Sequence, residues 1–279
     1  KLLREKVFEN IWIQPAAGDA GGAIGAALGA YHLMLGQPRI QHSEMDRMKG
    51  AYLGPRYGTP EIELRLKAAG AVFTTVSDAE VTELTAQALA EGKAVGWHQG
   101  RMEFGPRALG GRSIIADPRS PAVQKQLNLK VKYRESFRPF APSVLREDVS
   151  DWFDIQSDSP YMLLVADVLK THQIPMTAEQ EALFGIEKLN VPRSTLPAVT
   201  HVDYSARIQT VHKETNPRYH ALIQRFKELT GCPVLVNTSF NVRGEPIVST
   251  PEDAFHCLMG TEIEFLAVGN CILRKEDQD

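Results

Sequence analysis

The fold is decided by residues 94–116, which read AVGWHQGRMEFGPRALGGRSIIA. Two apolar runs, Ala94–Trp97 and Ser113–Ala116, flank a glycine-rich loop and are typical of short buried strands. In the loop, glycines allow the backbone to approach a ligand closely, Pro106 fixes a turn, and arginines supply permanent charge. The run therefore predicts an anion-binding loop carried between two strands.

Basic residues concentrate around this loop. Between residues 101 and 146 the chain has ten lysines and arginines against three acidic residues, although its formal net charge is −3. A hollow for a small anion and a solvated basic face are the two interpretations. We favour the hollow because several of the cations adjoin Gly or Pro in loops. The acidic remainder of the chain argues against binding to nucleic acid or to a membrane surface.

Strands alternate with helices along the chain, which predicts an α/β fold. The expected strands cover residues 11–13, 72–76, 94–97, 113–116, 140–145, 162–168, 206–211, 234–236, 265–268 and 271–274. The expected helices cover residues 61–69, 78–91, 121–129, 217–229 and 251–259. Ser77 and Glu80 have the spacing of a capping box ahead of residue 78. Three prolines break the pattern between residues 169 and 200, where we expect a lid-like excursion.

A second polar loop follows another apolar strand. Residues 234–236 run directly into NTSFNVRGEP at 237–246. Open α/β sheets place ligands at such strand ends, although Asn and Gly are also common in ordinary turns. The loop offers short hydrogen-bonding groups and one planar cation suited to phosphate, namely Asn237, Thr238, Ser239, Asn241 and Arg243. Two arginine-bearing loops together indicate a phosphorylated ligand with more than one anionic group.

The N-terminal region has a different composition. Residues 16–28 read AAGDAGGAIGAAL, a helix so rich in Gly and Ala that we expect a backbone or a ligand to lie against it. Asp19 either caps this helix or binds a metal or nucleotide. Residues 36–49 are polar and predict a linker.

Composition sets further bounds. Three cysteines without metal-binding spacing indicate a reducing, cytoplasmic setting. No apolar run approaches the roughly 18 residues of a membrane span. The sequence opens at Lys1 without an initiating methionine, and we therefore expect it to be part of a longer protein.

Three motifs resemble the C-terminal half of the O-carbamoyltransferases, the nodulation-factor and antibiotic-tailoring enzymes. They are GRMEFGPRALG at 100–110, FRPFAPS at 137–143 and NTSFN at 237–241, and the resemblance runs in order along nearly the whole chain. It implies a YrdC-like twisted mixed-sheet domain at residues 50–279, which forms carbamoyl-adenylate from carbamoyl phosphate and ATP. It also implies that residues 1–49 are the C-terminal fragment of an actin-like (ASKHA) domain, which passes the carbamoyl group to a hydroxyl using a bound iron.

The resemblance also implies a set of site residues. The cations expected to carry catalysis are Arg107, Lys132 and Arg138. Further contacts with phosphate or nucleotide oxygens are expected from Ser113, Arg207, Asn237, Ser239, Asn241 and Arg243. Asp19 matches an aspartate that ligates Fe²⁺, and its partner histidines belong to the N-terminal half of the family's proteins.

The ligands implied are carbamoyl phosphate, ATP with Mg²⁺, and a small-molecule hydroxyl acceptor. The resemblance leaves the oligomeric state open, a homodimer included. Two other functions also stay open. One is a non-catalytic nucleotide-binding module. The other is a threonylcarbamoyl-adenylate synthase acting in tRNA modification.

Overall fold

A mixed β-sheet forms the centre of the computed structural model, which describes residues 2–9, 11–40 and 47–278. Within these residues the sheet has nine strands in the order β1-β9-β8-β2-β3-β7-β4-β6-β5. The strands are β1 Thr74–Thr75, β2 Val95–His98, β3 Arg112–Ala116, β4 Ala141–Leu145, β5 Leu164–Asp167, β6 Ser205–Val211, β7 Val234–Ser239, β8 Phe265–Val268 and β9 Cys271–Arg274. The pairs β2–β8 and β4–β6 are parallel, and the other pairs are antiparallel.

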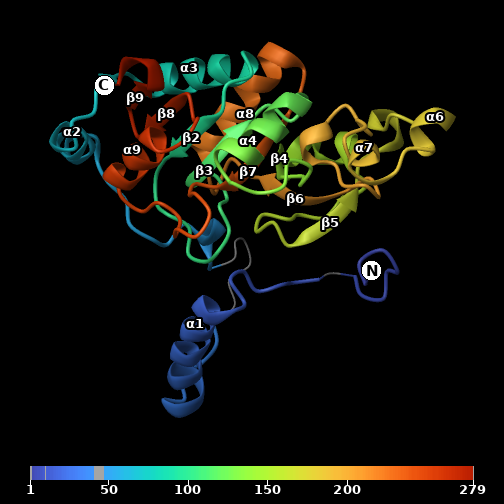
Figure 1. Ribbon diagram of the computed structural model, residues 1–279. Coiled ribbons are helices and arrows are strands. Elements are labelled where there is room, and N and C mark those ends of the chain that lie inside the picture. The colour runs from blue at the N-terminus through green and yellow to red at the C-terminus, as the bar shows by residue number, and fades with distance from the viewer. Residues whose placement is uncertain (1, 10, 41–46, 279) are drawn as a thin grey trace.

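Helices cover both faces of the sheet (Figure 1). The longer ones are α1 Asp19–Gly29, α2 Thr59–Ala68, α3 Asp78–Ala90, α4 Pro121–Lys130, α8 Pro217–Thr230 and α9 Pro251–Met259. Three short helices are α5 Val149–Trp152, α6 Ala178–Glu181 and α7 Gly185–Leu189. Successive residues of a strand point to opposite faces. The ring of Trp97 meets Tyr219 of α8, whereas His98 Nε2 lies 3.0 Å from the carbonyl oxygen of Ser249, just before α9. Helices α8 and α9 therefore lie on opposite faces.

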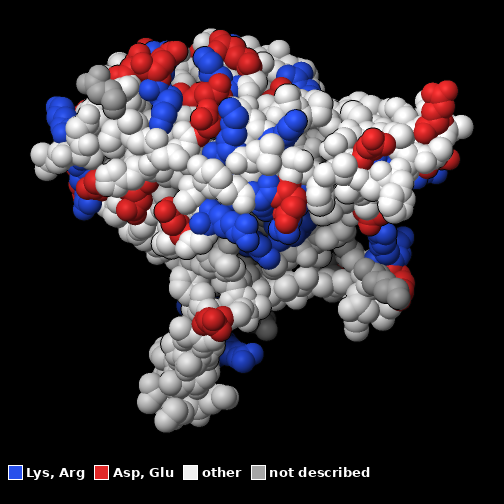
Figure 2. All heavy atoms as spheres, in the orientation of Figure 1, with Lys and Arg blue, Asp and Glu red and all other residues white. Residues whose placement is uncertain are grey.

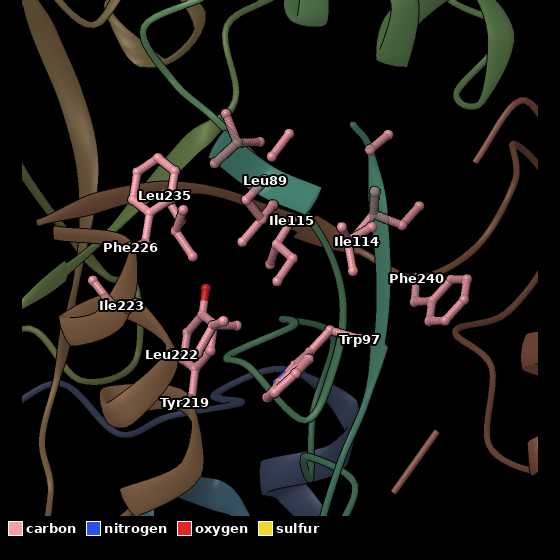
Figure 3. Packing of buried hydrophobic residues seen from close by; sticks show 14 of the residues in the cluster. Leu89, Trp97, Ile114, Ile115, Tyr219, Leu222, Ile223, Phe226, Leu235 and Phe240 are labelled. Carbon is pink, nitrogen blue, oxygen red and sulfur yellow. The ribbon is translucent and has the colours of Figure 1, made fainter. Parts of the chain in front are cut away.

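A large part of the hydrophobic core lies between α8 and the sheet. Tyr219, Leu222 and Phe226 recur every three or four residues on α8, so one face of the helix is apolar. These side chains project toward the strands that carry Trp97 and Ile115 (Figure 3). Each buried side chain of this size contributes roughly 1.5–3 kcal/mol of hydrophobic stabilisation, so this layer fixes the sheet on which the loops stand.

The strand register brings distant loops to one edge of the sheet. His98 at the end of β2 pairs with Arg112 at the start of β3, and Ser113 pairs with Ser239 at the end of β7. Ala141 at the start of β4 pairs with Asn237. The loops at residues 99–111, 131–140 and 240–249 therefore emerge side by side.

Most of the predicted elements are confirmed, including the α/β class. The capping box is present, because the Glu80 N–H donates to Ser77 Oγ and the Ser77 N–H donates to Glu80 Oε2. The excursion at residues 169–200 contains the short helices α6 and α7, and an isolated bridge between Gln173 and Ser194 crosses it.

One prediction for the N-terminal region is wrong. Residues 11–13 form no strand, because no neighbouring strand pairs with them among the described residues. No residue of α1 is buried, and the helix projects away from the sheet (Figure 1). The backbone or ligand expected against its glycine-rich surface therefore stays a prediction. Residues 41–46 of the predicted linker lie outside the described residues. No helix in the described part of the chain is long and apolar enough to cross a bilayer.

Gly96 is a test of this packing. A Cβ added there would lie 2.6 Å from Cζ of Phe240 and 2.9 Å from Cδ1 of Leu266. We expect Gly96→Ala to lower the free energy of unfolding by about 1–3 kcal/mol, since overpacking forces neighbours out of their rotamers. Urea denaturation measures the change. Gly25→Ala is the control, because Gly25 lies in α1 with no atom within 4 Å of the added carbon; equal losses in the two variants would contradict the packing described.

Candidate functional site

Five of the predicted site residues surround one hollow of about 290 Å³ at this edge of the sheet. They are Lys132, Arg138, Ser239, Asn241 and Arg243, and Arg134, Glu135, Thr238 and Val242 complete the lining. The loop before β4 supplies one wall and the end of β7 with its following loop supplies the other. Lys and Arg side chains gather over this part of the surface, below the position of α4 (Figure 2).

Lys132 joins the two walls of the hollow. Its side chain is buried, with 7% of its surface exposed. The ammonium donates to the carbonyl oxygen and Oδ1 of Asn241, both at 2.8 Å, and to the carbonyl oxygen and Oγ of Ser239, at 2.5 and 3.2 Å. All four acceptors are neutral. Because charged phosphate oxygens bind an ammonium more strongly than neutral oxygens do, an anion can compete for these protons.

Arg138 and Arg243 face solvent, whereas Arg134 is half-buried. Arg138 Nε lies 2.9 Å from Glu135 Oε2, and both side chains are about half exposed. Arg243 is exposed and donates from Nη1 to the carbonyl oxygen of Tyr133 at 3.3 Å. Four cations therefore surround a single carboxylate, and the balance leaves the hollow positive.

The environment shifts the pKa of several groups here. Burial lowers the pKa of Lys132 to about 7. Burial also lowers the pKa of Arg134, and the charge of Arg138 adds to the effect. A hydrogen bond from its own backbone amide lowers the pKa of Glu135, with a smaller effect from Arg138. Lys132 is thus the one cation of this hollow whose charge changes near neutral pH.

Arg107 and Arg207 form a second cationic pair outside this hollow. Arg107 lines a cavity of about 210 Å³ between residues 15–18 and Tyr161. Burial lowers the pKa of Arg207, on β6, and the nearby charge of Arg107 lowers it further. Through the pairs Ser143–Gln209 and Ala141–Asn237, the register places Arg207 on the sheet face that carries Asn237.

Ser113 and Asn237 lie beneath the loops. Ser113 Oγ accepts the Gly110 N–H at 3.0 Å. Asn237 Nδ2 donates to the carbonyl oxygen of Ala108 at 3.1 Å, to Ser143 Oγ at 3.0 Å and to Gln209 Oε1 at 2.8 Å. Its Oδ1 is buried with no hydrogen-bond partner among the described residues. Their contact with ligand oxygens stays a prediction, and in this structure both side chains support the loop.

Two charged side chains hold the shape of the loop at residues 99–111, a role that the sequence did not predict. Glu103 lies in the loop, and Arg112 is the first residue of β3. The buried carboxylate of Glu103 accepts the N–H groups of Leu109 and Gly111 at 2.6 and 2.7 Å. Arg112, fully buried, donates to the carbonyl oxygens of Gln99 and Gly111 at 3.0 and 2.9 Å. Arg112 is therefore a structural cation and not part of the anion-binding set.

Asp19 alone does not make a metal site. It is the first residue of α1, and Gly18 is the N-cap, so the capping alternative is wrong. In the described ranges no three His, Cys, Asp or Glu side chains are grouped so that they could hold an ion. A single carboxylate is fewer ligands than transition metals take in proteins. The described residues therefore do not fit iron, and its binding stays a prediction.

Two models of one protein family match this chain. The family model "Carbamoyltransferase C-terminus" matches residues 86–275, and "Carbamoyltransferase N-terminus" matches residues 1–28. The chain belongs to the carbamoyltransferase family. The C-terminal match includes both loops that form the hollow.

Relatives in this carbamoyltransferase family share the chain almost from end to end. The protein sll1178 of Synechocystis sp. is 62% identical over 280 residues, which cover all of this chain and 45% of that protein. Nodulation protein NolO of Bradyrhizobium diazoefficiens is 40% identical, covering 99% of this chain and 46% of that protein. A 3'-hydroxymethylcephem-O-carbamoyltransferase of Amycolatopsis lactamdurans is 33% identical, and the match covers 94% of this chain and 44% of that protein. The chain thus spans less than half the length of these curated relatives.

One solved structure, full-length HypF in its phosphate- and nucleotide-bound form, has a TM-score of 0.42 and 17% sequence identity. It covers 74% of this chain and 22% of that one. Such a similarity is below the level at which two folds are called the same.

The depressed pKa of Lys132 predicts how anion binding depends on pH. Below pH 7 the ammonium is charged, and above it the neutral amine loses its attraction for an anion. We expect sulfate, whose own charge is constant, to bind most tightly near pH 6 and to weaken by up to about tenfold for each pH unit above 7. Calorimetric titration measures this affinity.

Lys132→Met is the matched variant for this measurement. The arginines keep their charge throughout this range, so the variant should bind sulfate weakly and with little dependence on pH. A wild-type affinity that stays constant from pH 6 to pH 9 would show that Lys132 does not control the hollow.

Proposed function

We propose that this chain forms carbamoyl-adenylate from carbamoyl phosphate and ATP within a cytoplasmic O-carbamoyltransferase. The observation that carries the proposal is the convergence of Lys132, Ser239 and Asn241 with two arginines around one positive hollow. Residues 50–279 would be the adenylate-forming, YrdC-like domain, and residues 1–49 the fragment of an actin-like domain. The longer protein would then pass the carbamoyl group to a hydroxyl of a small molecule.

The proposed reaction depends mainly on cations that neutralise the reacting anions and on their correct placement. Water first cleaves carbamoyl phosphate into carbamate and phosphate. An oxygen of carbamate then bonds to the α-phosphorus of ATP, and pyrophosphate leaves. All of these groups are anions, so fixed cations that neutralise them and hold them in line supply most of the catalysis. No His–carboxylate pair is needed for such a step.

Lys132, Arg138 and Arg243 have distinct roles in this proposal. Lys132 holds a phosphate oxygen at the floor of the hollow, where it can exchange neutral acceptors for a charged one. Arg138 and Arg243 stand at the rim and neutralise the phosphates. Mg²⁺ would arrive on the triphosphate. Arg107 and Arg207, on the adjoining surface, would hold the carbamoyl phosphate end.

Isotope exchange between pyrophosphate and ATP tests the adenylate. We expect exchange that depends on carbamoyl phosphate, since only a reversible adenylation links the two. Lys132→Ala should lower it by roughly 100-fold, the loss expected when one buried charged donor is removed. Lys130→Ala is the control, because its ammonium lies 3.6 Å from the exposed Glu262 and outside the hollow.

The same assay separates the other two functions. A non-catalytic nucleotide-binding module would bind ATP and show no exchange. A threonylcarbamoyl-adenylate synthase would need threonine and bicarbonate and would not use carbamoyl phosphate. Either pattern would refute the proposed function.

Arg243 offers an independent test of the nucleotide's place. If its guanidinium binds phosphate, Arg243→Ala should weaken ATP binding by roughly 1.5–3 kcal/mol, the range for a charge-assisted hydrogen bond. Equilibrium binding of ATP measures the effect. Arg274→Ala, an exposed arginine on β9, should leave the affinity unchanged. An unchanged dissociation constant for Arg243→Ala would put that side chain outside the site.

A further inference from the structure

The loop that carries the cations of the hollow is held from beneath by one face of α4. The loop covers residues 131–140 and contains Lys132, Arg134 and Arg138. Gln124 and Asn128 lie four residues apart on α4, so their side chains occupy the same face of the helix. Asn128 is fully buried, which is rare for a side chain with two donors and an acceptor unless all of them are satisfied.

These two amides bind three successive carbonyl oxygens of the loop. Asn128 Nδ2 donates to the carbonyl oxygens of Ser136 at 3.1 Å and Arg138 at 2.8 Å. Gln124 Nε2 donates to the carbonyl oxygen of Phe137, between them, at 3.1 Å. The backbone on the C-terminal side of the loop is therefore fixed to the helix at every residue from 136 to 138.

Asn128 also fixes one of the cations directly. Its Oδ1 accepts Nε–H of Arg134 at 2.6 Å, and its backbone carbonyl oxygen accepts the Arg134 N–H at 2.9 Å. The guanidinium carbon of Arg134 lies 4.9 Å from the centre of the Phe140 ring. Arg134 also lines the hollow, so these contacts fix the position of one of its cations.

The backbone of this loop needs such support. Tyr133, between Lys132 and Arg134, has φ of 45°, in the left-handed region that a side chain other than glycine rarely adopts. A conformation of this kind costs of the order of 1 kcal/mol and persists only where its surroundings determine it. Bonds from the Lys132 N–H to the Leu127 carbonyl oxygen and from the Arg134 N–H to Asn128 hold both flanks.

We propose that Asn128 is a positioning residue for the anion site, acting through the loop and touching no ligand itself. Its single amide ties together Arg134, the carbonyl of Ser136 and the carbonyl of Arg138, and so sets the spacing of the cations that face the hollow. The catalytic part of this inference depends on the proposed function, whereas the ordering of the loop does not.

The test compares three variants with the wild-type protein. Asn128→Ala removes every side-chain bond. Asn128→Asp keeps an acceptor for Arg134. It replaces the donor to the carbonyl oxygens of Ser136 and Arg138 with a carboxylate oxygen, which repels them. Gln124→Ala, at a half-buried position, removes one loop bond and is the milder variant if the Asn128 variants do not fold. Gln126→Ala is the control, because Gln126 lies on the same helix and takes no part in the loop bonds described above.

Two readouts are independent of any reaction. Sulfate affinity should fall at least about fivefold in Asn128→Ala, because loss of hydrogen bonds lets the cations separate. Trypsin under native conditions should cut after Lys132 and Arg134 at least about fivefold faster than in wild type, since cleavage follows the population of the open loop. Gln124→Ala should change both in the same direction by less, and Gln126→Ala should change neither.

A purely structural role gives a different result. It would lower the melting temperature and the fraction of active molecules, while folded molecules kept their sulfate affinity and their resistance to trypsin. That outcome would overturn the proposal. In the exchange assay we expect a higher KM for carbamoyl phosphate or ATP in Asn128→Ala. If the wild-type protein shows no exchange, the proposed function fails, and the sulfate and trypsin comparisons still decide the role of Asn128.

Discussion

The candidate site depends on the register of four adjacent strands. Because Arg112 pairs with His98, Ser113 with Ser239 and Ala141 with Asn237, three loops far apart in sequence leave the sheet at the same edge. A slip of one residue in any pair would turn the alternating side chains to the opposite face. The apolar layer between α8 and Trp97 prevents such a slip, so the core determines where the polar loops meet.

Much of the fold could be predicted because its signals are local. The spacing of Ser77 and Glu80 is enough to predict the start of a helix. Gly231 ends α8 in the left-handed conformation, which glycine adopts more easily than other residues. The failure at residues 11–13 has the opposite cause. An apolar triplet indicates an extended backbone, but a strand also needs a partner, and no local pattern says whether one lies alongside.

The sequence predicts only part of the site's geometry, and the roles of its residues stay predictions. Lys132, Ser239, Asn241, Arg138 and Arg243 meet in one hollow, whereas Arg107 and Arg207 lie together outside it. Glu103, Arg112 and Asn128 escaped notice because polar residues that bind a ligand and polar residues that hold a loop look the same in sequence. The two roles can be told apart only in the structure, from how deeply each side chain is buried and from whether it bonds to a backbone carbonyl or amide.

The neutral surroundings of Lys132 have a thermodynamic consequence. At physiological pH a part of the ligand-free molecules holds this amine without its proton, because burial has lowered its pKa to about 7. An anion that settles beside it favours the charged form and so draws a proton from the solvent. Binding of an anionic ligand would therefore favour the protonated Lys132 that balances its charge. The ligand-free protein does not have to bury a full positive charge at this position.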